Sequence, residues 1–64
     1  MAVWSKMAAL SLAEVREYLT QAGVESEVVQ PTISELRDGE IFAASPGERL
    51  WWDSARGAFQ LQRK

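Results

Sequence analysis

The sequence predicts a small α+β domain in which one N-terminal amphipathic helix packs on a three- to four-stranded antiparallel sheet. One observation is segment 12–22, where apolar residues at helical spacing stand between a capping motif and a glycine. Another is segment 48–62, where two alternating stretches flank a turn at 54–57. We expect residues 1–9 to form an N-terminal arm and residues 10–64 to form a single domain.

Composition limits the possible functions. The chain has 64 residues, fewer than the roughly 70–80 at which one apolar core comfortably offsets chain entropy. It contains neither cysteine nor histidine, so disulfides are excluded and the usual zinc ligands are missing, which leaves a partner or self-association as added support. The net charge of −2 gives no broad attraction to nucleic acid. Without a long apolar run, we expect a cytoplasmic protein that does not enter membranes.

The helix has start and stop signals at both ends. Ser11 and Glu14 have the spacing of a capping box, Leu10 and Val15 that of a hydrophobic staple, and Gly23 that of a C-terminal cap. We therefore predict a helix from Leu12 to Ala22. Its apolar stripe is expected to comprise Leu12, Val15, Leu19 and Ala22.

The middle of the chain predicts two strands separated by a short helix. Val24–Gln30 alternates apolar and polar residues, as an edge strand does. Pro31–Gly39 has a second capping box, formed by Thr32 and Glu35, and room for one or two helical turns. Glu40–Ser45 reads as a strand that ends in a tight turn.

The registers of the last strands follow from their turns. If residues 54–57 form the loop and Gly57 takes a positive φ, Trp52 faces Phe59 and Leu50 faces Leu61. If Ser45 faces Glu48 in the preceding turn, Phe42 faces Trp51. A bulge there would reverse the face of 40–45. Without the bulge, the face toward the helix carries Ile41, Ala43, Leu50, Trp52, Phe59 and Leu61.

The sequence contains no constellation that predicts catalysis, a cofactor or a metal. Pairs of acidic residues, such as Glu25 with Glu27, fall on predicted solvated faces. The possible lysine partners of a serine nucleophile, Lys6 and Lys64, lie near the chain ends. Every glycine stands where a helix or turn ends, which leaves no phosphate-binding loop. We therefore expect a protein that is not an enzyme.

Aromatic residues on the second face of the sheet favour a binding role. Phe42 and Trp51 are predicted to pair there, and the neighbouring residues Arg49, Gln60 and Gln62 would form a polar rim. The N-terminal residues are expected either to fray or to form a short arm whose Trp4 docks on the sheet or on a second subunit. Alternatively, Trp4 and Val3 fold back over the aromatic pair and close it within the monomer. The composition is typical of a protein-interface centre. We expect a small interaction or regulatory module that binds a protein partner or itself.

A resemblance suggests an alternative function. Residues Gln30–Leu36 (QPTISEL) look like the opening of the recognition helix in many helix-turn-helix regulators, and 32–44 followed by a hairpin is similar in layout to excisionase and MerR-type winged helices. The resemblance implies duplex DNA binding. The contacting residues would be Thr32, Ser34, Arg37, Arg49 and Arg56.

Two features depart from that resemblance. The segment between Gly23 and Ile33 is longer than the usual helix-turn-helix spacing and reads as a strand. Glu35 and Asp38 also lie beside Arg37, whereas DNA-contacting helices are usually basic. Protein binding is therefore the first expectation from the sequence, and DNA binding is the alternative.

Overall fold

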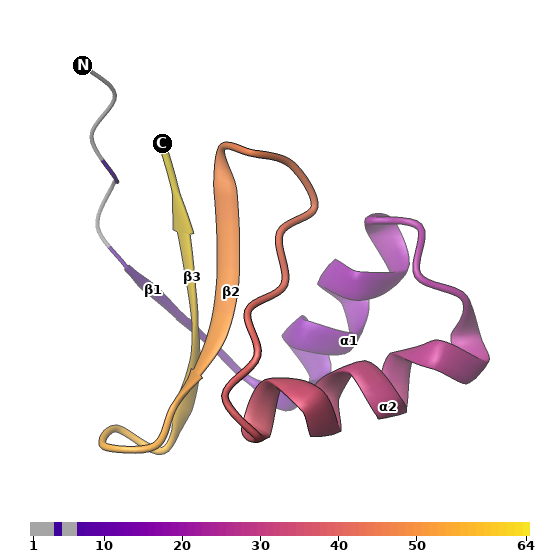
Figure 1. Ribbon diagram of the computed structural model, residues 1–64, viewed down its shortest axis with the longest axis horizontal. Coiled ribbons are helices and arrows are strands. Elements are labelled where there is room, and N and C mark those ends of the chain that lie inside the picture. The colour runs from indigo at the N-terminus through magenta and orange to yellow at the C-terminus, as the bar shows by residue number, and fades with distance from the viewer. Residues whose placement is uncertain (1–3, 5–6) are drawn as a thin grey trace.

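The computed structural model describes Trp4 and residues 7–64. The described residues have an α+β fold, in which two helices lie on one side of a three-stranded antiparallel sheet (Figure 1). The elements are, in chain order, β1 Ala8–Leu10, α1 Leu12–Gln21, α2 Ser26–Arg37, β2 Glu48–Asp53 and β3 Ala58–Arg63. None of the helices described has the length and apolar character that crossing a membrane requires.

Helix α1 confirms the predicted capping box and first residue, and it ends at Gln21, one residue before the predicted end at Ala22. The backbone N–H of Glu14 donates to Ser11 Oγ at 3.2 Å, and the Ser11 N–H donates back to Glu14 Oε1 at 2.9 Å. The helix gives way to Gly23, whose φ of 93° is readily available only to glycine. The buried part of its stripe is narrower than predicted, because Leu12 is exposed and Val15 and Leu19 are buried.

Helix α2 corrects the prediction for the middle of the chain. Residues 26–37 form one helix, so the strand predicted at Val24–Gln30 and the separate short helix after it are wrong. Thr32 is no helix cap: it lies inside α2, where its hydroxyl donates to the carbonyl of Val28 at 2.8 Å. The helix continues through Pro31, because burying Val29, Ile33 and Leu36 at helical spacing outweighs the hydrogen bond that proline cannot make.

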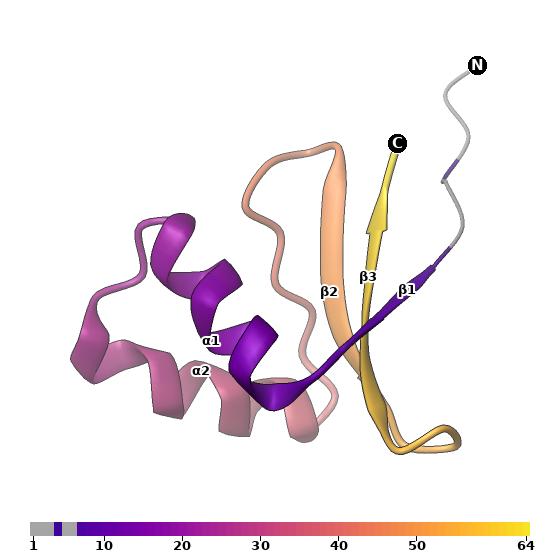
Figure 2. The ribbon, with the colours of Figure 1, turned by 180° about the vertical axis from the view of Figure 1, so that it is seen from behind.

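Strand β1 was not anticipated from the sequence. It pairs with β3 through Ala8–Leu61 and Leu10–Phe59, so β3 is the central strand of the sheet. Figure 2 shows β1 leading directly into α1. Of the predicted N-terminal arm, residues 1–3 and 5–6 lie outside the described residues.

The hairpin of β2 and β3 has the predicted register. Trp52 pairs with Phe59 and Leu50 pairs with Leu61. Gly57 takes the positive φ expected of it, 64°. The rings of Trp52 and Phe59 pack edge to face with centroids 4.8 Å apart, on the side of the sheet that the helices cover.

The segment before β2 differs from the prediction. Instead of forming a strand over 40–45, it makes a single bridge, from Phe42 to Leu50 rather than to Trp51. The turn at Ser45 and Glu48 is present, with a 3.1 Å backbone hydrogen bond, so one extra residue is accommodated before it. This bulge turns Phe42 toward the core, and Ile41, which was expected inside, is 62% exposed.

The hydrophobic core lies between the helices and the covered face of the sheet. Leu10, Tyr18, Val24, Phe42 and Trp52 pack around it and are partly buried. Its buried members are Val15, Leu19, Val29, Ile33, Leu36, Leu50, Phe59 and Leu61.

Candidate functional site

The face of the sheet that points away from the helices carries the predicted binding residues other than Phe42. We call this surface the outer face; it comprises Trp4, Arg49, Trp51, Gln60, Gln62 and Lys64. The strand alternation of β2 and β3 places four of these residues on one side, opposite the core residues Leu50 and Leu61. In Figure 1 this is the side of the sheet away from α1 and α2.

Aromatic rings and cations interleave on the outer face. The guanidinium carbon of Arg49 lies 4.2 Å from the ring centroid of Trp4 and 5.3 Å from that of Trp51. Lys64 Nζ lies 5.0 Å from the Trp4 ring. Each such cation–π contact stabilises by about 0.5–1 kcal/mol at an exposed site and more where water is excluded. Trp4 therefore lies on the sheet of its own chain, as expected both for a docked arm and for a tryptophan that covers this face within the monomer.

A hydrogen-bonded glutamine fixes the position of Arg49. Its Nε and Nη2 both donate to Oε1 of Gln62, at 3.0 and 2.6 Å, across the β2–β3 pair. Gln60, the cross-strand neighbour of Trp51, is only 4% exposed. Trp4, Arg49 and Trp51 are half-buried, so part of each side chain remains open to solvent.

Phe42 does not belong to this surface. Its ring packs edge to face on Tyr18, with centroids 6.3 Å apart, at the margin of the core. The predicted Phe42–Trp51 pair is therefore wrong, because the bulge before β2 moves Phe42 to the other face of the sheet. Trp4 takes the place beside Arg49 and Trp51, and Lys64 is a member that the sequence did not indicate.

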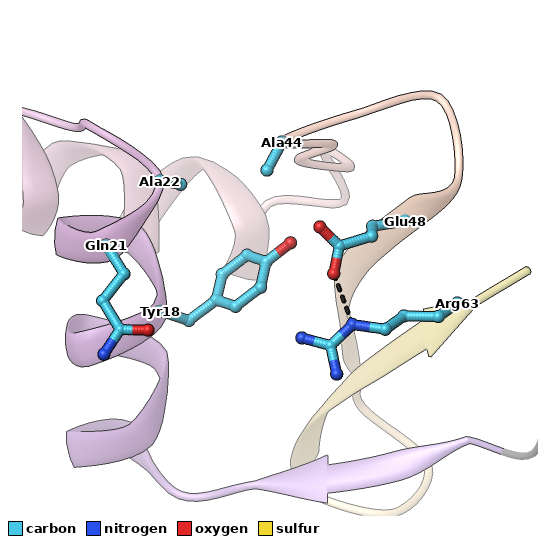
Figure 3. Close-up of a pocket in the computed structure, with 6 residues that line it drawn as sticks. All are labelled: Tyr18, Gln21, Ala22, Ala44, Glu48 and Arg63. Atoms are coloured by element: carbon cyan, nitrogen blue, oxygen red, sulfur yellow. Dashed lines mark hydrogen bonds and ion pairs between the residues drawn. The ribbon is translucent and has the colours of Figure 1, made fainter.

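A cavity of about 260 Å³ lies between α1 and the ends of β2 and β3 (Figure 3). Glu48 and Arg63 form an ion pair on its wall, with Arg63 Nε donating to Glu48 Oε2. Tyr18 directs its hydroxyl toward Glu48, close enough for the carboxylate to act on the phenol but outside the geometry of a regular hydrogen bond. The cavity is lined by Tyr18, Gln21, Ala22, Ala44, Glu48 and Arg63.

The hydroxyl of Tyr18 is sealed from solvent and has no hydrogen-bond partner in the described part of the protein. Burial raises the pKa of this phenol, and the negative charge of Glu48 raises it further. The group therefore stays neutral well above physiological pH and is not poised for proton transfer. Among the residues the structure describes, no group of acidic side chains could hold a metal ion.

The residues predicted for DNA binding are not brought together. Ser34 is exposed on α2, whereas the hydroxyl of Thr32 is used within that helix. Arg37 lies over the Trp52 ring, 5.5 Å from its centroid. Arg56 pairs with Asp53 at 3.4 Å in the hairpin loop, and Arg49 is on the face away from α2.

The helical layer is acidic. Residues 11–40 carry seven of the nine acidic residues and two of the seven basic ones. The acidic residues are Glu14, Glu17, Glu25, Glu27, Glu35, Asp38 and Glu40; the basic ones are Arg16 and Arg37. The basic character of the described structure is therefore concentrated in the sheet.

Comparison of the chain with known protein families, curated proteins and solved structures gives no match.

Proposed function

We propose that this protein is a non-catalytic binding module that holds a protein partner on its outer face. The stack of Trp4, Arg49 and Trp51 carries the proposal. Tryptophan and arginine are the residues that most often dominate binding energy at protein interfaces. Here the strands and Gln62 hold them in position before any partner arrives, which lowers the entropic cost of binding.

The fold does not depend on the outer face for its core. The fully buried apolar residues lie between the helices and the opposite face of the sheet. The tryptophans of the outer face are half-buried, so a partner could still remove apolar surface from water. This separation of a core face from an aromatic, partly open face supports a surface that serves binding.

The test compares Trp51→Ala with Ile41→Ala, a matched loss of apolar surface at an exposed position away from the outer face. Both variants are expected to fold, as judged by circular dichroism. Proteins captured from a lysate by the parent protein should be kept by Ile41→Ala and lost by Trp51→Ala. Loss of an interface tryptophan commonly costs about 2 kcal/mol or more, roughly thirtyfold in affinity. A Trp51→Ala variant that loses its melting transition but keeps every captured protein would refute the proposal.

DNA binding is the second candidate, and one observation favours it. Four residues, 22–25, separate α1 from α2, and the β2–β3 hairpin follows. A short turn of this kind, containing Gly23, is typical of helix-turn-helix proteins. It removes the spacing objection that the sequence raised, because the supposed strand belongs to α2.

The charge on α2 opposes this second function. Glu27 and Glu35 lie on the helix that would enter the major groove, and phosphate contacts require cations. We expect no retention of duplex DNA at physiological salt. Sequence-specific retention that is lost on both Arg37→Ala and Arg56→Ala, but not on Arg16→Ala, would establish DNA binding instead.

A further inference from the structure

We infer that the outer face binds an acidic segment of its protein partner, one in which aspartate or glutamate lies beside apolar residues. This inference rests on the proposed function. The positive charges that the fold leaves uncompensated on the outer face indicate the kind of segment that would bind there.

Among the described residues, the cations of the outer face form no ion pair with an acidic side chain, unlike two other arginines of the hairpin. Arg63 pairs with Glu48, and Arg56 pairs with Asp53. In the described part of the chain, no ion pair joins Arg49 or Lys64 to an acidic side chain. Residues 1–10 contribute no acidic side chain at all.

The guanidinium of Arg49 is held in place and keeps an uncompensated positive charge, which suits it to bind a carboxylate. Two of its N–H groups bind the neutral amide oxygen of Gln62, which orients the guanidinium but leaves its charge uncompensated. The side chain is half-buried between the rings of Trp4 and Trp51, where water screens its charge less than on an open surface. A carboxylate bound there would form a charge-assisted hydrogen bond, and its apolar neighbours would cover the tryptophan rings.

The rest of the protein would direct such a segment to this face. The helical layer carries a large excess of acidic residues and lies on the far side of the sheet (Figure 1). An acidic segment is repelled by that layer and attracted by the cations of the outer face. The acidic side chains lie across the sheet from the outer face, and salt with a Debye length of about 8 Å weakens their repulsion there.

A second copy of the chain fits the outer face less well. A two-fold dimer through this surface would bring Arg49 and Lys64 of each copy toward the same cations of the other. Like charges in contact oppose association. A head-to-tail contact with the acidic helices of another copy would instead produce an assembly whose mass grows with concentration. Measurement of the mass in solution distinguishes that outcome.

The experiment is a selection of random peptides displayed on phage, with the parent protein and Trp51→Ala as parallel baits. Peptides enriched by the parent but not by Trp51→Ala are then synthesised, and their affinities are measured. We expect these peptides to be rich in aspartate and glutamate. Their affinity should fall about tenfold or more on Arg49→Gln, recover substantially on Arg49→Lys, and weaken as salt is raised.

The matched control is Arg16→Gln, which removes the same charge from the helical layer and should leave the peptide affinity unchanged. Peptides that depend on Trp51 but are not acidic, or that bind Arg49→Gln as tightly as the parent, would overturn this inference and leave the proposed function standing. No Trp51-dependent enrichment would overturn both. A mass in solution that rises with concentration and returns to that of a monomer on Arg49→Gln would assign the face to a second copy and overturn the acidic-segment inference.

Discussion

Replacing Tyr18 with phenylalanine should stabilise the protein. The tyrosine hydroxyl is buried without a partner, a condition that costs about 1–3 kcal/mol relative to a paired or solvated group. Phenylalanine keeps the ring and its edge-to-face contact with Phe42 but removes the polar atom. A net gain of about 1 kcal/mol would raise the melting temperature by roughly 4–8 °C in a domain of this size. Thermal melts followed by circular dichroism at neutral pH measure it directly.

The opposite sign would refute this reasoning. If Tyr18→Phe lowers the melting temperature by several degrees, the hydroxyl makes a hydrogen bond, with Glu48 as the nearest candidate. Glu48→Gln is the companion variant, because it removes the charge but keeps a possible acceptor. A hydroxyl paired to Glu48 predicts that Glu48→Gln changes the melting temperature by a different amount in the parent than in Tyr18→Phe, because the loss of the Glu48–Arg63 ion pair is common to both backgrounds.

Alkaline pH provides an independent check on the same group. Burial, and then the charge of Glu48, raise the pKa of Tyr18 in the folded chain above its value of about 10 in the unfolded chain. The stabilisation linked to this raised pKa is fully present below pH 10 and is lost as the pH rises through the folded pKa. The parent should therefore lose stability above pH 10 more steeply than Tyr18→Phe. Because the chain has one tyrosine, its phenolate absorbance reports the shift without overlap from other tyrosines.

Three further substitutions test the fold by thermal or urea unfolding. Ser11→Ala should lower the free energy of unfolding by about 1 kcal/mol, since it deletes the capping box of α1, and Ser11→Asp should retain most of it. Leu50→Ala should lower the free energy of unfolding by about 2–5 kcal/mol, because Leu50 is fully buried, whereas Ile41→Ala at an exposed site should lower it by less than about 0.5 kcal/mol. Equal losses would show that Ile41 is buried, as the strand predicted at 40–45 requires. Gly57→Ala should cost about 1 kcal/mol because its φ is 64° and no atom lies within 4 Å of the added Cβ; an unchanged stability would show that the loop can relax.

The elements that the sequence predicted correctly are those whose ends are set by residues close together in the chain. The capping box and Gly23 bound α1 without help from distant contacts. The hairpin register follows from the loop at 54–57 and the alternation around it. In α2 the local signals conflict: Pro31 and the alternating residues before it favour a break, and the burial of Ile33 and Leu36 in the assembled core decides for a helix.

The candidate site was predictable to the extent that it lies on the hairpin. Arg49, Trp51, Gln60 and Gln62 share a face because of strand alternation, and the sequence showed this. Phe42 was misplaced because a single extra residue before β2 has no clear sequence signal. The position of Trp4 depends on the pairing of β1 with β3, a contact between residues far apart in the chain that local patterns do not reveal. Lys64 instead continues the alternation of Gln60 and Gln62, and its backbone N–H donates to the carbonyl of Gly47 at 2.8 Å.

The central place of β3 has a consequence for how the protein folds. In chain order β3 is the last of the elements described, yet both β1 and β2 pair with it. On a ribosome, α1 and α2 can form as they emerge, but β1 has no neighbour to pair with until β3 has been synthesised. Closing that long loop is entropically costly, which should slow folding relative to a helical protein of similar length. Until then β1 offers an unpaired edge, so the nascent chain is most vulnerable to aggregation just before its final strand is made.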